Sequence, residues 1–320
     1  MPLIQHYRRR GMTLIELLVV ISILGLLAVT VLPNLSNNDS RRKVREAAMT
    51  ISSFIAGGQS RALGSRAGGG VWIDLRPSPI ASGPIAAGYA INLADADVPA
   101  SYAGDSISSS VTFGTASPGA STAAVTFTGG CTPPSGSNNL IRLGNAPALF
   151  TLSTVSGSTA TVSMRSSANQ TASNTSWPRP NSPMTYEIIG PPTRASGNTL
   201  TLGNAVAIDL YHSWFQGQSL QAVLGSGTTP FQILFDSTGR PQYVACNGSR
   251  QPINNSLYLL VASIESIEST GTSSNSALAP KDGYWVAIEP RGGIPKVTEV
   301  YTSGTSLVDQ QKYIREGAVR

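Results

Sequence analysis

The sequence predicts an α+β protein in which one long N-terminal helix precedes a β-rich globular head. Three observations predict this fold class. Residues 12–35 are apolar apart from one charge, residues 41–63 carry apolar side chains at helical spacing, and short β-rich runs separated by turn residues follow Gly70. Charged residues make up only 12% of the chain. That low share, with abundant Gly, Ser and Thr, favours an exported β-rich domain over a helical cytoplasmic enzyme.

The first eleven residues, MPLIQHYRRRG, form a short basic segment. The whole chain has 22 Lys and Arg against 17 Asp and Glu, a net charge of +5. Without the arginines at positions 8–10 the balance is 19 against 17, a net of +2. A globally basic nucleic-acid-binding protein is therefore not indicated.

The apolar segment that follows is long enough to cross a membrane. Its 24 residues, 12–35, contain a single charge, Glu16. As a helix they would span about 36 Å, against about 30 Å for the hydrocarbon core of a bilayer. The preceding arginines place the amino end in the cytoplasm, and the chain beyond Pro33 on the far side. A cleaved secretory signal would need a small-x-small site, and residues 27–32 offer a poor one. A plain anchor would leave Glu16 unexplained, because an intramembrane charge costs about 3 kcal/mol.

The string GMTLIELLVVI at residues 11–21 resembles the type III signal of type IV pilins and type II secretion pseudopilins. The resemblance implies that a membrane-bound prepilin peptidase cuts after Gly11 and methylates the new N-terminal residue, Met12, which replaces the usual phenylalanine. The retained segment would then be a single-pass anchor in the bacterial inner membrane, with the N-terminus cytoplasmic and the head periplasmic. The implied partners are other pilins or pseudopilins in a filament, the inner-membrane assembly platform and membrane lipid.

Two residues of this segment are candidates for assembly. Glu16 lies at i+4 from the Met12 amine, and the resemblance implies that in a filament it meets the amine of a neighbouring subunit. Alternatively, Glu16 pairs with its own N-terminus or reaches lipid headgroups. Pro33 lacks an N–H group, so the helix is expected to kink or to end there.

The expected domain organisation has four parts. These are a cleaved leader at 1–11, a transmembrane and assembly helix at 12–34, an amphipathic continuation at 35–67, and a β-rich periplasmic head at 68–320 with a Ser/Thr/Gly-rich insertion at about 101–194, partly disordered at 166–181. The apolar stripe expected to pack the helix onto a sheet comprises Val44, Ala47, Ala48, Ile51, Phe54, Ile55 and Leu63. The basic cluster Arg41, Arg42, Lys43 and Arg45 either contacts anionic headgroups, faces solvent or contacts other subunits.

The head is predicted to contain twelve strands, at 71–75, 89–93, 111–113, 125–128, 149–155, 159–164, 185–189, 205–210, 231–235, 257–262, 284–289 and 296–300. Residues 231–240, FQILFDSTGR, resemble the strand–turn element of GspH/FimT-like minor pseudopilins and pilins. Physically this is a hairpin whose glycine supplies a positive φ.

Few residues suggest chemistry, and we expect no enzyme activity, cofactor or metal. His212, with Asp209 and Ser213 nearby, is better interpreted as a hydrogen-bonded histidine than as part of a catalytic triad. A loop calcium site at Asp95 and Asp97 is a weaker hypothesis. Cys131 and Cys246 lie beyond the expected membrane segment, where they form either a disulfide closing a loop of about 115 residues or two free thiols.

The C-terminal tail carries three cations, Lys312, Arg315 and Arg320. Some FimT-like pilins use basic residues near the C-terminus to bind DNA, so these are candidate phosphate contacts; a solvated terminus is the alternative. The sequence as a whole favours a structural subunit of a type II secretion pseudopilus or type IV pilus, in a minor role. A DNA-binding minor pilin for DNA uptake is the alternative, and a membrane-anchored enzyme is the third.

Overall fold

A computed structural model describes residues 14–76, 89–115, 120–131, 133–134, 138–144, 149–164, 177–203, 205–220, 223, 229–246, 249–269, 283–300 and 312–314, without the side chains of 27–38 and 249. The chain divides into two compact units, Met1–Lys43 and Val44–Arg320.

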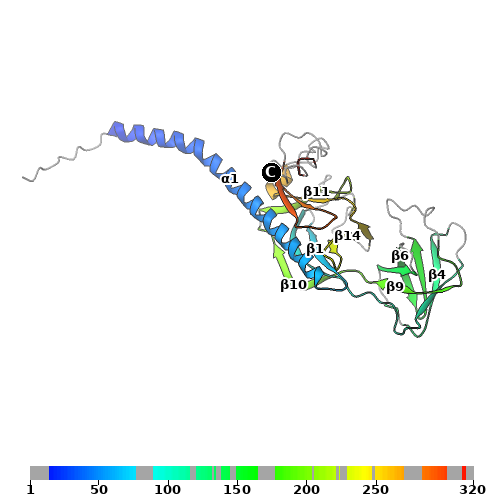
Figure 1. Ribbon diagram of the computed structural model, residues 1–320. Coiled ribbons are helices and arrows are strands. Elements are labelled where there is room, and N and C mark those ends of the chain that lie inside the picture. The colour runs from blue at the N-terminus through cyan, green and yellow to red at the C-terminus, as the bar shows by residue number, and fades with distance from the viewer. Residues whose placement is uncertain are drawn as a thin grey trace, which may run out of the picture. The chain divides into compact units, whose positions relative to one another are not determined.

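Helix α1 runs from Leu14 to Leu63 and belongs partly to each unit (Figure 1). Its backbone is helical across Pro33, so the expectation that the helix ends at this residue is wrong. The helix closes with hydrogen bonds from Gly64 N to the Arg61 carbonyl, 3.0 Å, and from Ser65 N to the Ala62 carbonyl, 3.1 Å. It therefore ends four residues before the predicted boundary at 67.

The stripe on the second part of α1 packs into the main core of the head. Val44, Ala48, Ile51 and Ile55 are completely buried. Leu63 was expected in the stripe but is 60% exposed, and Ala62 is buried in its place. The stripe continues seven residues after Ile55, at Ala62, because seven residues are close to two helical turns.

The helix comes close to the first strand at a glycine. A Cβ added at Gly58 would lie 2.8 Å from Cγ2 of Val71 and 3.5 Å from Cε2 of Phe235. Glycine at this position allows a close approach of the Val71 side chain, which would have to shift if a Cβ were present.

In the described part of the head, eleven strands form sheet A, in the order β15-β14-β13-β1-β2-β11-β16-β17-β18, with β10 paired to β2 and β12 to β11. All the pairings are antiparallel. The bounds are β1 Gly69–Arg76, β2 Tyr89–Asp97, β10 Thr193–Thr201, β11 Val206–Phe215, β12 Gln218–Ser219, β13 Phe231–Phe235, β14 Pro241–Cys246, β15 Ser249–Pro252, β16 Leu257–Ser263, β17 Tyr284–Ile288 and β18 Lys296–Glu299. A short helix, α3 (Ile264–Ser269), follows β16.

Alternate residues of sheet A enter different clusters, as the period of two in a strand requires. Leu257 and Leu259 of β16 belong to the core that contains the α1 stripe. Tyr258 and Leu260 face the other way and form a second cluster with Trp285. A third, small cluster on β2, β13 and β14 contains Ala96, Leu234 and Ala245, with Trp72, Val98 and Tyr243 packed against it.

A second sheet, sheet B, is built from residues within the segment expected to be an insertion. Its described strands number seven, in the order β8-β3-β4-β7-β6-β5-β9. They are β3 Ser110–Phe113, β4 Thr122–Thr128, β5 Asn139–Leu143, β6 Leu149–Ser156, β7 Thr159–Met164, β8 Pro183–Met184 and β9 Tyr186–Ile189. Sheet B has a hydrophobic cluster of its own, which includes Phe113, Phe127 and Phe150. The predicted disorder at 166–181 falls mostly on residues outside the described ones.

Each of the twelve predicted strands overlaps an observed strand. Six observed strands were not predicted from the sequence: β5, β8, β10, β12, β14 and β15. The hairpin predicted at 231–240 is present: Gly239, at φ 75°, donates from its N–H to the Asp236 carbonyl, 2.9 Å, and β13 pairs with β14.

Candidate functional site

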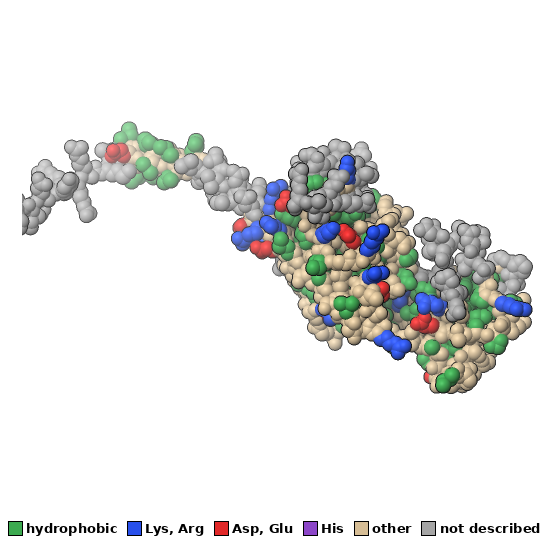
Figure 2. Space-filling view, in the orientation of Figure 1, with side chains coloured by type: hydrophobic (Ala, Val, Ile, Leu, Met, Phe, Trp, Pro, Cys, Tyr) green, Lys and Arg blue, Asp and Glu red, His purple; other side chains and the backbone are tan. Residues whose placement is uncertain are grey.

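The N-terminal part of α1 exposes a continuous apolar surface. Every residue from 14 to 26 is exposed, and ten of these thirteen are large aliphatic side chains, with exposed fractions from 42% at Val20 to 83% at Leu14. Figure 2 shows these apolar side chains along the described start of the helix. A helix that is apolar on all faces is not stable in water by itself and requires an apolar environment.

The polar residues of this segment are few. Ser22 donates its hydroxyl to the Leu18 carbonyl, 2.8 Å, so that hydroxyl is satisfied within the helix. Glu16 lies in the first turn of α1, where a negative charge interacts favourably with the helix dipole. Gly11 and Met12, the predicted processing residues, lie outside the described residues, as does the Pro33 side chain.

Among the residues that the structure describes, no helix has both the length and the apolar character needed to span a membrane. The predicted span, 12–34, includes two residues, 12 and 13, and eight side chains, 27–34, outside that description.

The basic cluster of α1 follows this segment. Arg41, Arg42, Lys43 and Arg45 are all exposed, while Val44 among them is buried. The cluster therefore lies on the outer face of the helix, where it is accessible to an anionic surface or to another subunit.

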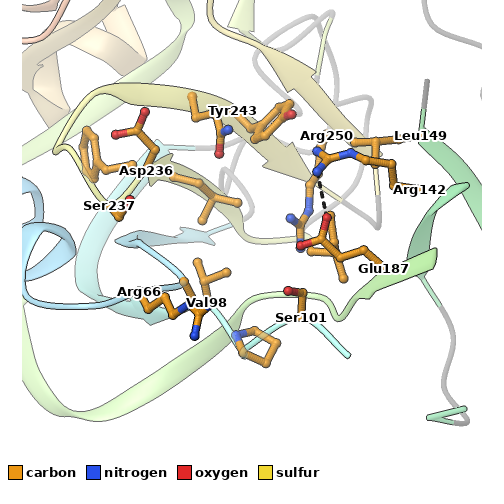
Figure 3. A pocket seen from close by; sticks show the side chains of 16 residues that line it. Arg66, Val98, Ser101, Arg142, Leu149, Glu187, Asp236, Ser237, Tyr243 and Arg250 are labelled. Atoms are coloured by element: carbon orange, nitrogen blue, oxygen red, sulfur yellow. Dashed lines mark hydrogen bonds and ion pairs between the residues drawn. The ribbon is translucent and has the colours of Figure 1, made fainter. Parts of the chain in front are cut away.

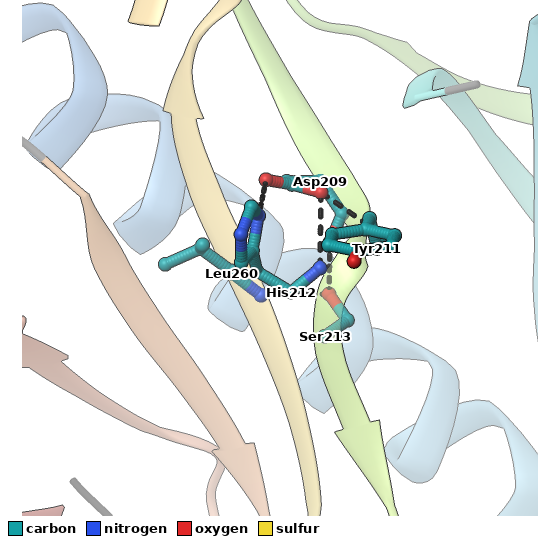
Figure 4. A network of polar contacts seen from close by, with 5 residues as sticks. All are labelled: Asp209, Tyr211, His212, Ser213 and Leu260. Atoms are coloured by element: carbon teal, nitrogen blue, oxygen red, sulfur yellow. Dashed lines mark hydrogen bonds and ion pairs between the residues drawn. The ribbon is translucent and has the colours of Figure 1, made fainter. Parts of the chain in front are cut away.

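The histidine cluster lies at an irregularity in sheet A (Figure 4). Asp209 of β11 pairs with Leu260 of β16, and Trp214 pairs with Tyr258. Residues 210–213 therefore stand opposite a single residue of β16, which makes a large bulge.

The Asp209 carboxylate organises this bulge. Asp209 is 2% exposed and accepts hydrogen bonds from the backbone N–H of Tyr211, 2.9 Å, and of His212, 3.1 Å. Its other oxygen lies 2.6 Å from Nδ1 of His212. At the bulge, the two backbone N–H groups do not bond to any of the described neighbouring strands, and the Asp209 carboxylate accepts their hydrogen bonds instead.

Ser213 is bonded to the backbone and not to the histidine. Its hydroxyl donates to the Asp209 carbonyl and accepts from Leu260 N at 2.9 Å. In the described structure, Nε2 of His212 is buried with no hydrogen-bond partner. The geometry thus brings Asp209 and His212 together but does not connect a nucleophile to the base, as a catalytic triad would require.

The two cysteines lie in different clusters. Cys131 belongs to the core of sheet B and Cys246 to the main core of sheet A. Both side chains are buried and no disulfide joins them, so of the two alternatives the structure has the separate thiols. The Cys131 thiol donates to the Thr128 carbonyl at 3.7 Å, and burial raises the pKa of Cys246.

Asp95, for which a calcium site was the weaker hypothesis, forms an ion pair with Arg61. Asp95 is 9% exposed and accepts a hydrogen bond from Nη2 of Arg61, which links the end of α1 to β2. Burial raises the pKa of Asp95, and the Arg61 charge opposes that rise. In the described parts of the chain, no group of three or more His, Cys, Asp or Glu is placed to hold a metal ion.

Of the candidate DNA contacts, Lys312 is described and exposed, whereas Arg315 and Arg320 lie outside the described residues. The head also contains a polar cavity, lined by Arg66, Arg142 and Arg250, that was not predicted from the sequence. These arginines are at least 76 positions apart in the sequence, so no local motif could have identified them.

Comparison with known proteins matches one short segment of the chain. The family model of the prokaryotic N-terminal methylation motif matches residues 6–32. This motif is typical of type IV pilin-like proteins that a prepilin peptidase processes. No curated protein and no solved structure matches the chain.

Proposed function

We propose that this protein is a structural subunit, a minor pseudopilin or minor pilin, of a type II secretion pseudopilus or type IV pilus. In this proposal a prepilin peptidase cleaves after Gly11 and methylates Met12. The helix of 12–34 first anchors the chain in the bacterial inner membrane and then packs against other subunits in the filament. The head lies on the periplasmic side.

The single observation that carries the proposal is the exposed apolar surface over residues 14–26, inside the matched motif of 6–32. Burial of a large aliphatic side chain is worth about 1.5–3 kcal/mol, so ten such side chains strongly favour an apolar environment. A bilayer and a bundle of identical helices both provide one. The second part of α1 already buries its apolar stripe in the head, which leaves the first part available for these partners.

Glu16 is the proposed assembly residue. It is the only charged residue from 14 to 26, and it lies one helical turn from the Met12 amine that cleavage would create. In an apolar bundle, a carboxylate and an amine from neighbouring subunits would neutralise each other.

We also propose that the role is structural and not enzymatic. Ser213 is engaged with the backbone of the bulge, and the Asp209 carboxylate serves the same bulge. These contacts support a stabilising role for the cluster. DNA binding by the C-terminal cations stays a prediction from the sequence.

Processing is tested by co-expressing the full chain with a prepilin peptidase and measuring the intact mass. We expect loss of residues 1–11 and the gain of one methyl group on Met12. Gly11→Ala should leave the leader attached. The matched control is Gly25→Ala, also in the apolar segment, where an added Cβ meets nothing within 4 Å. Cleavage beyond residue 27, or equal processing of both variants, would argue for an ordinary signal peptide or a plain anchor.

Assembly is tested in a bacterium that makes the filament. Glu16→Gln should be processed normally but should not co-purify with sheared filaments. Glu46→Gln, on an exposed part of the same helix, serves as the control and should be incorporated like the natural chain. Equal incorporation of both variants would remove the proposed role of Glu16.

A further inference from the structure

A polar cavity of about 240 Å³ lies in the head, between residues of sheet A and residues of sheet B (Figure 3). On the side of sheet A it is lined by Leu234 of β13, Tyr243 of β14 and Arg250 of β15. On the side of sheet B it is lined by Arg142 of β5 and Glu187 of β9. The cavity is on the face of sheet A that carries the small cluster of Leu234 and Tyr243, and not in the core that contains α1.

The residues that line this cavity carry a net positive charge. Three arginines (66, 142 and 250) and two acids (187 and 236) line it, which leaves a net of +1. Glu187 accepts a hydrogen bond from Nη1 of Arg142 at 2.7 Å.

The other lining acid, Asp236, is engaged in its own turn. Burial raises the pKa of Asp236, but hydrogen bonds from the Thr238 hydroxyl and from backbone N–H groups outweigh that effect and lower it. Asp236 is thus held as a carboxylate by donors outside the cavity. Of the three arginines, Arg142 is paired with Glu187 and Arg250 donates to the Gly190 carbonyl, so an incoming carboxylate would share their guanidinium groups with these partners.

Arg250 gives the cavity a fixed donor. It is only 6% exposed, and its Nη2 donates to the Gly190 carbonyl. A guanidinium presents five N–H groups in a rigid plane that matches the two oxygens of a carboxylate. Figure 3 shows Arg250 beside Arg142 and Glu187 at one end of the cavity, with Arg66 and Asp236 toward the other end. An anion entering the cavity would therefore meet guanidinium groups from both ends.

The rest of the lining is mixed: it includes the aliphatic side chains of Val98, Leu149 and Leu234 and polar ones such as Ser101 and Gln242. A water molecule takes about 30 Å³ of liquid volume, so the cavity has room for about eight waters, or for one molecule the size of an amino acid. A single surplus positive charge balances a monoanion and not a dianion.

We propose that this cavity binds a small organic monocarboxylate with a short aliphatic body. The carboxylate would contact the guanidinium groups, and the aliphatic body would lie against the apolar lining. This site is separate from the helix proposed for assembly, so its test is independent of that proposal.

The experiment is calorimetric titration of the full chain in a non-ionic detergent with N-acetyl-L-leucine. Two probes are compared with it: the neutral N-acetyl-L-leucinamide, which lacks the carboxylate, and inorganic phosphate, which lacks the aliphatic body. We expect saturable binding of N-acetyl-L-leucine with a Kd on the order of 1 mM or tighter. The amide and phosphate should each bind at least about tenfold more weakly, because each lacks one of the two interactions.

Substitutions locate the binding site. Arg66→Gln removes an exposed guanidinium and should weaken binding about tenfold without affecting folding. Arg142→Gln should have a similar effect. Arg179→Gln, at an exposed residue that does not line the cavity, is the matched control and should bind like the natural chain.

Several results would overturn the proposal. Absence of saturable binding would do so, as would equal affinity for the acid and the amide, or phosphate binding as tight as that of the acid. Binding by Arg66→Gln and Arg142→Gln that matches Arg179→Gln would show that the ligand binds elsewhere.

Discussion

The contact between α1 and β1 at Gly58 gives a sharp test of how the head is packed. An alanine Cβ at this position would lie 2.8 Å from Cγ2 of Val71, which is completely buried. Overpacking of this kind costs about 1–3 kcal/mol. Alanine also improves helix propensity over glycine by about 0.8–1 kcal/mol. The net effect of Gly58→Ala should be a loss of about 0–2 kcal/mol in the free energy of unfolding.

The neighbouring glycine provides the control. An alanine Cβ at Gly57 would be nearest to Nη1 of Arg61, at 3.2 Å, so the guanidinium that pairs with Asp95 would need to shift by only a few tenths of an ångström. Gly57→Ala should therefore keep most of the propensity gain and stabilise the head by about 0.5–1 kcal/mol. Both variants change the same residue type in the same helix, so their difference isolates the contact with β1.

The assay is urea unfolding of the full chain, followed by the fluorescence of its four tryptophans, of which Trp72, Trp214 and Trp285 lie in sheet A. Val71→Ala removes the clashing methyl group and costs stability by itself, but combined with Gly58→Ala it should restore part of the loss. The coupling between the two substitutions should be favourable and larger than about 0.5 kcal/mol. Gly58→Ala that is as stable as Gly57→Ala, or additive effects in the double variant, would refute the packing argument.

Three further predictions concern the head. Ser213→Ala should destabilise it by about 1–3 kcal/mol, because the buried N–H of Leu260 loses its acceptor; unchanged urea unfolding would contradict the bulge role of Ser213. The carboxylate of Asp236, whose pKa is lowered, should add stability that is complete above the unfolded-state pKa of about 3.9 and is lost as pH falls through the lower folded-state pKa. Asp236→Asn should flatten the dependence of the free energy of unfolding on pH below about 4, whereas an equal slope in both proteins would exclude this contribution. Binding of labelled duplex DNA by the full chain, measured across salt, should be weak and nearly unchanged when the tail cations are replaced by alanine, because Asp309 and Glu316 oppose them; steep salt dependence lost in that variant would favour DNA uptake. The cations replaced are Lys312, Arg315 and Arg320.

The parts of the fold that follow a local period were predictable from the sequence. The stripe of Val44, Ala48, Ile51 and Ile55 has the helical period, and all four are buried. The prediction was wrong for the last residue of the stripe. Leu63 was predicted because it is hydrophobic, but the helical period places Ala62 on the buried face. The role of Gly58 could not be predicted from a local pattern, because Val71, which its Cβ would meet, belongs to a strand that follows the helix.

Contacts between distant segments were not predictable. The disulfide hypothesis rested on the presence of two cysteines beyond the expected membrane segment, but Cys131 and Cys246 are buried in separate hydrophobic clusters. Asp95 suggested a cation site by its proximity to Asp97, whereas its partner, Arg61, comes from the helix. In both cases the pairing depends on the topology of the sheets and not on the spacing in the chain.

The two parts of α1 have different apolar patterns, and this difference connects the fold to the proposed function. From Val44 onward, α1 has one apolar face, and the head covers it. From Leu14 to Leu26 the apolar side chains surround the helix, so no single sheet could cover them. Only an environment that surrounds the helix satisfies that second pattern, and lipid and a bundle of similar helices both do so. A subunit that moves from a membrane into a filament would exchange one such environment for the other. The burial of the second part of the helix would keep the head attached throughout, and a packing defect at Gly58 should therefore weaken the head without affecting processing at Gly11.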